Sequence, residues 1–381
     1  MQMNLPQFLK NYRNKTVNDL YNRAFTNLSH SLCENKALIF IGFLYFLTTI
    51  IIHCFFNKKI IENLAFYYSL VNNLYILFFS TFGCFFLLSK IKNFGLPVTL
   101  KQTVYAISFS KYFFNFIIIY ILFPIFFFSY SSIKQIIPYF FSFNFKHDYL
   151  LAKIDYILHM NNHPWEILHP IIGHPLITIV IDRLYIYWGI IFFFTVMYMA
   201  FHKNFVLRKR FFITLCFSWI FIGNILAAFF FSAGPCYFKE VTGIDNNAYT
   251  ELFLYLKSIP GLNAIRIQEH LWSSFSENIF MPLGGISAMP SMHVSVATLL
   301  ALLYLNLNKF FGTIMIIYAL LIQIGSVHLG WHYAVDGYIS STVTIILWLS
   351  HSFFQKIYPV KKLSAQKHRT KWLPEVGSRT P

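Results

Sequence analysis

Eight apolar stretches dominate this sequence, and each is long enough to cross a lipid bilayer as a helix, which takes about 20 residues. Charged side chains make up only 12% of the chain, a share that excludes an ordinary water-soluble fold. Because backbone groups inside a bilayer must be hydrogen-bonded within the chain, we predict an all-α, polytopic membrane helix bundle. The stretches lie near 37–56, 64–88, 106–130, 184–201, 211–233, 289–308, 310–330 and 334–354.

Polar segments divide the chain into four predicted parts. Within the third part, residues 131–183 mix acidic residues, histidines and prolines with short apolar runs, which predicts short interfacial or re-entrant helices. Residues 234–288 form a second long polar connection. The four parts are a cytoplasmic N-terminal segment (1–36), accessory transmembrane helices (37–130), a membrane core (131–354) and a basic cytoplasmic tail (355–381).

The first chemical cluster stands at the start of the sixth apolar stretch. Ser287 can cap a helix there, and Pro290 suits the first turn. The backbone N–H groups near Ser291 and Met292 would then be free, and a helix N-terminus favours an anion. His293 follows in the same turn. These residues predict an anion site, and the alternative is a capped membrane helix whose histidine reaches the interface.

The second cluster stands at the start of the eighth stretch. His332 and Asp336 are four residues apart, so a helix would bring them to one face. A carboxylate there can hold one imidazole nitrogen and leave the other free to attack an electrophile. His328 precedes His332 by four residues, so the three side chains also have the spacing of zinc ligands. A structural polar pair inside the membrane is the remaining alternative.

The distribution of charge gives the orientation. The formal net charge is +16, but the basic residues lie between apolar stretches and form no nucleic-acid-binding patch. With eight spans, 20 of the 30 Lys and Arg residues fall on the side of both termini, and 11 of the 14 Asp and Glu residues fall on the other. Because basic loops stay in the cytoplasm, both clusters are predicted on the non-cytoplasmic face, of the plasma or inner membrane if the source is bacterial.

The two clusters resemble motifs of the type 2 phosphatidic acid phosphatase superfamily. Pro290 to His293 is similar to its Pro-Ser-Gly-His motif, and Gly325 to Asp336 is similar to its Ser-Arg-x5-His-x3-Asp motif. The resemblance covers roughly residues 150–354 and implies a six-helix-type phosphatase core that needs no metal or other cofactor. It also implies roles: His332 as the nucleophile that forms a phosphohistidine, Asp336 as its orienting carboxylate, His293 as general acid, and Ser291 with its neighbours as phosphate ligands.

The sequence departs from that superfamily at two basic positions. The superfamily's Lys-x6-Arg-Pro motif has no counterpart, because the chain contains no Arg-Pro pair; its positional equivalent is the segment 232–237. Ser326 stands where the third motif has Arg. Loss of both cations is similar to the branch that contains inositolphosphorylceramide synthase. Lys239 and Arg266 are candidate replacement cations, with an ordinary solvated role as the alternative for each.

These observations predict an integral-membrane lipid phosphatase or phosphotransferase that acts on a phosphorylated lipid in the bilayer. The acceptor would be water or an alcohol, with transfer of a phospho-headgroup such as inositol phosphate as one form. One alternative is a lipid-binding or transport protein with degenerate catalytic motifs. The other is a metal-dependent membrane hydrolase. No nucleic-acid partner is expected.

Overall fold

The computed structural model describes residues 5–56, 66–70, 72, 73, 76, 110–142, 144–277, 279 and 284–357, with the backbone alone at 5–21 and 351–357. Helices make up the regular structure of these residues, and no strand occurs among them. The longer helices are α1 (Leu5–Phe55), α4 (Lys111–Phe140), α7 (Pro175–Ala200), α8 (Phe205–Phe217), α13 (Met292–Leu307), α14 (Lys309–His328) and α15 (Ala334–Ile357). The shorter ones are α5 (Asp148–Leu158), α6 (Pro164–Ile172), the π-helix η1 (Ser218–Leu226), α9 (Ala227–Phe229), the 3₁₀-helix η2 (Pro235–Tyr237), α10 (Phe238–Thr242), α11 (Thr250–Lys257) and α12 (Asn263–Ser276).

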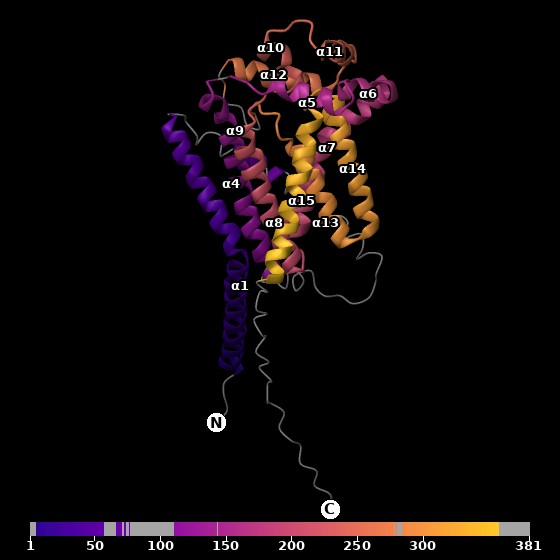
Figure 1. Ribbon diagram of the computed structural model, residues 1–381. Helices are drawn as coiled ribbons and strands as arrows, with labels where there is room; N and C mark the ends of the chain where they lie inside the picture. The colour runs from indigo at the N-terminus through magenta and orange to yellow at the C-terminus, as the bar shows by residue number, and fades with distance from the viewer. Residues whose placement is uncertain are drawn as a thin grey trace, which may run out of the picture.

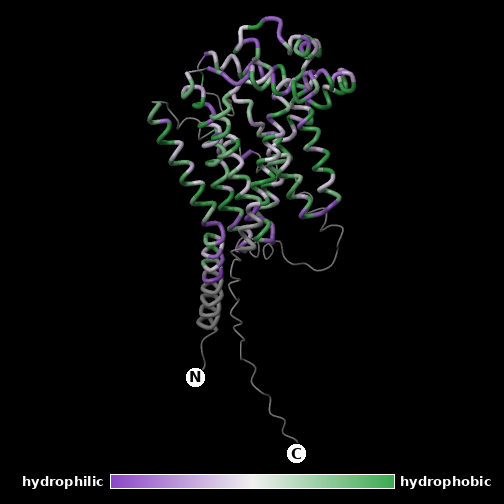
Figure 2. The backbone as a smooth tube through the Cα atoms, in the orientation of Figure 1, coloured by the Kyte–Doolittle hydropathy of each residue, from purple (hydrophilic) through white to green (hydrophobic). Residues whose placement is uncertain are grey.

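The predicted polytopic helix bundle is confirmed. Five helices in the described part of the chain are long and apolar enough to cross a membrane, and α13 and α15 add two shorter apolar helices. Hydrophobic residues run along the long helices, while hydrophilic residues gather toward their ends (Figure 2). The five are Asn22–Phe55 of α1, Lys111–Phe140, Pro175–Ala200, Phe205–Phe229 and Lys309–His328.

Two helices extend beyond their predicted limits, and one predicted span lies mainly outside the described residues. The stretch 106–130 continues as α4 to Phe140, and α7 begins at Pro175, not at 184. Their polar residues were taken for loop residues, but Asp182 accepts three hydrogen bonds inside the protein and so is satisfied within a helix. The predicted span 64–88 falls largely outside the described residues.

A core of aromatic and branched side chains joins the long helices. Phe192 of α7, Trp219 of η1, Leu300 of α13 and Trp348 of α15 belong to one buried cluster, with side chains of α1 and α4. Burying such large apolar groups supplies packing contacts even where lipid, not water, surrounds the bundle. The helices that carry the two sequence clusters are therefore held in one rigid unit.

The short helices form a polar layer over one end of the bundle (Figure 1). α5 and α6 come from the mixed segment 131–183, and α10, α11 and α12 come from 234–288. The first segment contains the expected short helices, although its outer residues belong to α4 and α7; their interfacial or re-entrant position stays a prediction. The layer lies at the end of the bundle where α15 begins, and the N-terminal part of α1 lies at the other end.

Candidate active site

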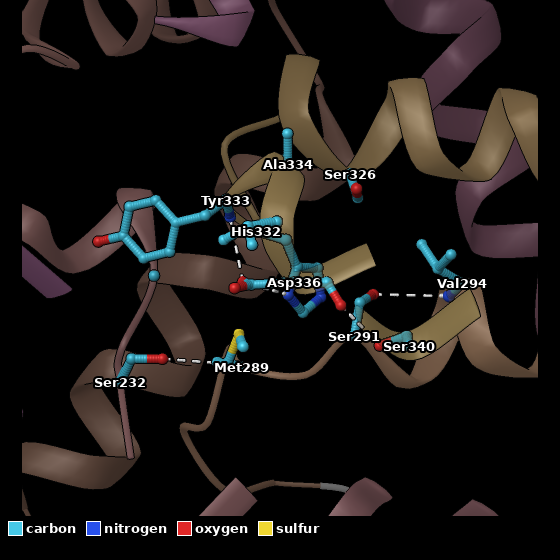
Figure 3. A network of polar contacts seen from close by, with 12 residues as sticks. Ser232, Met289, Ser291, Val294, Ser326, His332, Tyr333, Ala334, Asp336 and Ser340 are labelled. Carbon is cyan, nitrogen blue, oxygen red and sulfur yellow. Dashed lines mark hydrogen bonds and ion pairs between the residues drawn. The ribbon is translucent and has the colours of Figure 1, made fainter. Parts of the chain in front are cut away.

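The turn between α14 and α15 carries His332 and Asp336. The N–H groups of Trp331 and His332 both donate to the carbonyl of Ser326, at 2.9 and 3.1 Å, which closes the turn. Asp336 Oδ2 lies 3.3 Å from His332 Nδ1 and accepts the N–H of Tyr333 at 3.1 Å. Asp336 is fully buried and His332 is 9% exposed. The carboxylate thus orients the imidazole through one nitrogen (Figure 3).

The start of α13 lies directly against this turn. The Ser291 N–H donates to the backbone carbonyl of Asp336 at 3.3 Å, and Ser291 Oγ accepts the N–H of Val294 as the N-cap. The helix therefore begins at Met292, and the prediction that Ser287 caps it was wrong. The Ser291 N–H is also not free for an anion as expected, because α15 supplies a carbonyl beside it. The two sequence clusters are joined through this bond.

His293 lies between aromatic rings. Tyr185 of α7 stacks on the imidazole with a centroid distance of 4.5 Å and an interplanar angle of 19°, and Trp188 lies 4.6 Å away. No hydrogen bond to the His293 ring occurs among the described residues. Two ring contacts fix the imidazole plane while its nitrogens stay available to a ligand, which suits a group that donates and accepts protons.

Buried carboxylates of the polar layer hold the two loops around the site. Asp155 of α5 accepts the N–H groups of Ala334 and Val335 at 2.6 and 2.9 Å, so it caps the start of α15. Asp148 accepts those of Ala233 and Gly234, both at 2.8 Å. Each carboxylate therefore fixes two consecutive backbone positions next to the turn between α14 and α15.

The segment after α9 also supports the α13 start. Ser232 binds it through two atoms: its carbonyl accepts the Ala288 N–H at 2.8 Å and its Oγ accepts the Met289 N–H at 3.1 Å. Gly234 has φ +97°, and a Cβ there would lie 2.7 Å from the Trp331 carbonyl oxygen. A glycine is required by both the backbone conformation and this close approach.

The electrostatic surroundings favour a neutral His332. Burial is the main cause that lowers the pKa of His332, to about 3, and the nearby His293 and Lys134 lower it further. The carbonyl of Ala288 acts in the opposite direction. At neutral pH the imidazole is therefore unprotonated at one nitrogen, which is the state that a nucleophile needs.

His328 does not join His332 and Asp336. Its Nε2 lies 2.9 Å from Thr178 Oγ1, which in turn lies 2.8 Å from the hydroxyl of Tyr255. The zinc alternative requires the three side chains to converge, and the structure does not bring them together. Within the described ranges, no group of three His, Cys, Asp or Glu side chains is arranged to hold a metal ion.

The remaining predicted residues are placed as follows. Ser326 is fully buried, and its hydroxyl donates to the Gln323 carbonyl at 2.7 Å. Lys239 is 61% exposed and forms an ion pair with Asp245. Arg266 donates to Asn263 Oδ1 at 3.0 Å. Pro290 is buried before the α13 start, and Met292 is half-buried against the aromatic core.

Sequence reasoning assigned no role to Lys134 or Tyr185, and it placed Ser232 only as part of the segment 232–237 that is equivalent to a family motif. Lys134 stands inside an apolar run, and a charged residue in such a run indicates a functional group. The predicted span ended at residue 130, so Lys134 was assigned to the mixed segment that follows. Tyr185 has no strong local signal, because aromatic side chains are common in this chain, and the contacts of Ser232 cannot be read from its position in the sequence. Their proximity to the site depends on helix packing.

Comparison with known proteins gives one match. The family model of the PAP2 superfamily, the type 2 phosphatidic acid phosphatases, matches residues 150–350. This range includes α5 to α15 nearly complete, and it contains His293, His332 and Asp336. No curated protein and no solved structure matches the chain. The matched range is more than half of the sequence, and the chain therefore belongs to the PAP2 superfamily.

Proposed function

We propose that this membrane protein of the phosphatase type transfers the phosphoryl group of a lipid phosphate through a covalent intermediate on His332. The observation that carries the proposal is the His332–Asp336 pair beside His293, in a site that keeps His332 unprotonated. A neutral imidazole with one nitrogen held by a carboxylate is an oriented nucleophile.

The first step forms one bond and breaks another. The free nitrogen of His332 attacks phosphorus, and the bond from phosphorus to the leaving alcohol oxygen breaks. His293, in its protonated form, donates a proton to that oxygen. Asp336 stabilises the positive charge that develops on the His332 ring as it becomes N-phosphorylated.

The second step reverses these roles. Water or an alcohol attacks phosphorus, the bond from phosphorus to the His332 nitrogen breaks, and neutral His293 accepts the proton of the attacking group. Water as acceptor gives a phosphatase, and an alcohol gives a headgroup transferase. The two missing family cations support the transferase form, because the branch that contains inositolphosphorylceramide synthase is similar in this respect.

The phosphate-binding part of the proposal uses the start of α13. Ser291, Met292 and Pro290 place the first turn next to His332, and Ser326 closes the turn from which His332 projects. The N-terminal end of a helix favours a phosphate electrostatically even when one of its N–H groups is already bonded.

Purified full-length protein in detergent tests this proposal. Phosphatidic acid in mixed micelles, with and without an added polyol, should yield phosphate or a transferred product, measured by lipid mass spectrometry. His332→Ala and His332→Asn should abolish turnover, because neither side chain forms a phosphoenzyme. Equal turnover by either variant would remove His332 as nucleophile, and no turnover by the wild type would favour a lipid-binding or transport protein.

We further propose that the active site faces away from the cytoplasm, as the charge distribution predicts. The polar layer lies at the end of the bundle opposite the N-terminal part of α1 (Figure 1). In a background with the five native cysteines replaced by serine, Asp245→Cys and His270→Cys should react with an impermeant thiol reagent on intact cells. Ala365→Cys should not react. The reverse pattern would place the site in the cytoplasm.

A further inference from the structure

We propose that Lys134 of α4 binds the phosphate of the substrate, and that it replaces the cations that the family motifs lack in this chain. This inference rests on the proposed function, since it assigns a further residue to the same site. It also gives a role to a helix that lies outside the range matched by the family.

Two contacts of α4 place Lys134 beside the start of α13. A Cβ built on Gly285 would lie 3.2 Å from Lys134 Cγ, so the loop that leads to α13 passes directly over this side chain. One turn earlier on the same helix face, Tyr130 packs with Met292 around Gly223: a Cβ there would lie 2.5 Å from the Tyr130 ring and 3.0 Å from Met292 Sδ. The Lys134 side chain therefore starts beside the loop that leads to α13, one helical turn from the residue that packs with Met292.

Lys134 also acts electrostatically on the proposed nucleophile. The charge of Lys134 acts on the His332 ring and helps to lower the pKa of that histidine. Ala288, whose carbonyl acts on the same ring, lies three residues after Gly285. A cation that lies beside this loop and whose charge acts on His332 is a candidate to bind the oxygens of a phosphoryl group that His332 attacks.

Lys134 differs from Arg208 and Lys111, two other cations of the bundle, in having no carboxylate partner among the described residues. Arg208 and Lys111 each lie 2.7 Å from a carboxylate oxygen of Glu34. Lys134 is half-buried, and among the described residues no carboxylate forms an ion pair with it. A charge removed from water without a counter-ion is unfavourable, and a bound phosphate would provide that counter-ion.

Orthovanadate and phosphatidic acid are suitable probes for purified full-length protein. Loss of a hydrogen bond to a charged group corresponds to roughly 10- to 100-fold weaker binding. We therefore expect Lys134→Met to raise the inhibition constant of orthovanadate by about this factor and to lower kcat/KM for phosphatidic acid at least as much. Lys134→Arg should recover much of the loss. Lys153→Met, which removes an exposed lysine of α5 in the polar layer, should behave as the wild type.

The outcomes separate this inference from the function on which it rests. A wild-type inhibition constant and kcat/KM in Lys134→Met would overturn the role of Lys134 while the phosphoryl-transfer site stands. A reduced kcat with an unchanged inhibition constant would also overturn the phosphate contact. A wild-type protein that neither hydrolyses phosphatidic acid nor binds orthovanadate would overturn both. If Lys134→Met fails to fold, as judged by size-exclusion chromatography, Lys134→Gln takes its place with the same expected results.

Discussion

The two ends of the helix bundle use carboxylates differently. At the polar end, Asp148 and Asp155 bind pairs of backbone N–H groups. At the opposite end, the half-buried Glu34 of α1 binds the side chains of Lys111, the first residue of α4, and Arg208, which lies in the first turn of α8. The first arrangement fixes backbone atoms of loops and helix starts, and the second ties three helices together. The comparison indicates that the polar end is built for positional accuracy and the other end for assembly.

Substitution of Asp336 should give the largest effect on activity. Asp336→Asn removes the carboxylate that holds Nδ1 of His332, so the reactive tautomer is lost, and kcat should fall by about 10³- to 10⁴-fold, as for other orienting carboxylates. Steady-state kinetics with phosphatidic acid measure this loss. A decrease of less than tenfold would show that Asp336 serves folding alone, in the same way as a carboxylate of the opposite end.

His293→Ala should have a smaller effect, of the size typical of general acid catalysis, roughly 10²-fold in kcat. p-Nitrophenyl phosphate, whose leaving group needs no proton, should recover part of that loss. The rate comparison between the two substrates is the measurement. An equal decrease for both substrates would contradict the role of His293 as general acid.

Asp155 and Glu34 provide the matched pair for the comparison between the two ends. Asp155→Ala removes the cap of α15, so the free energy of unfolding should fall by about 1–2 kcal/mol, and kcat should fall because the same turn carries Asp336. Glu34→Gln leaves the buried Arg208 without its charge partner and should lower stability by about 1–3 kcal/mol. Its kcat should match the wild type. Thermal unfolding and steady-state kinetics of both variants are the measurements. Loss of activity in Glu34→Gln, with activity kept in Asp155→Ala, would contradict the difference between the two ends.

The smallest expected effect is a pH dependence of stability. His332 has a pKa lowered to about 3 in the folded protein, whereas an unfolded histidine titrates near about 6.5. As pH falls below that value, the unfolded chain binds a proton that the folded chain does not, so stability decreases from pH 7 toward pH 5. His332→Asn should lose less stability over this range. Identical melting curves against pH for both proteins would show that His332 is not held neutral by the fold.

Much of the fold followed from the sequence, because apolar length is a strong signal in a membrane protein. The helix ends were less accurate where a polar residue lies inside a helix, as Asp182 does in α7. Such a residue resembles a loop residue until its partners are known. Here the partners are N–H groups of Asn263 and Ala264, more than 80 positions away in the chain.

The candidate site, like the fold, was predicted from the sequence only in part. The spacing of His332 and Asp336 predicted their contact, although His332 lies in the turn before α15 and not in the helix itself. Helix packing around α13 brings Tyr185 of α7, Lys134 of α4 and Ser232, which follows α9, toward the site. Local sequence does not specify this packing. The Ser291 N–H was expected to be free because its partner is distant in the sequence. The carbonyl that accepts it belongs to Asp336, 45 residues later.

The central claim is that His332 carries the phosphoryl group. Its most direct test is rapid acid-free quenching of the purified protein after a brief reaction with ³²P-labelled phosphatidic acid, followed by peptide mapping. We expect label that is stable in alkali and released by mild acid, as a phosphoramidate should be, on the peptide containing His332 and absent from His332→Ala. Label on another residue, or turnover by the wild type with no labelled protein at any reaction time, would contradict the account.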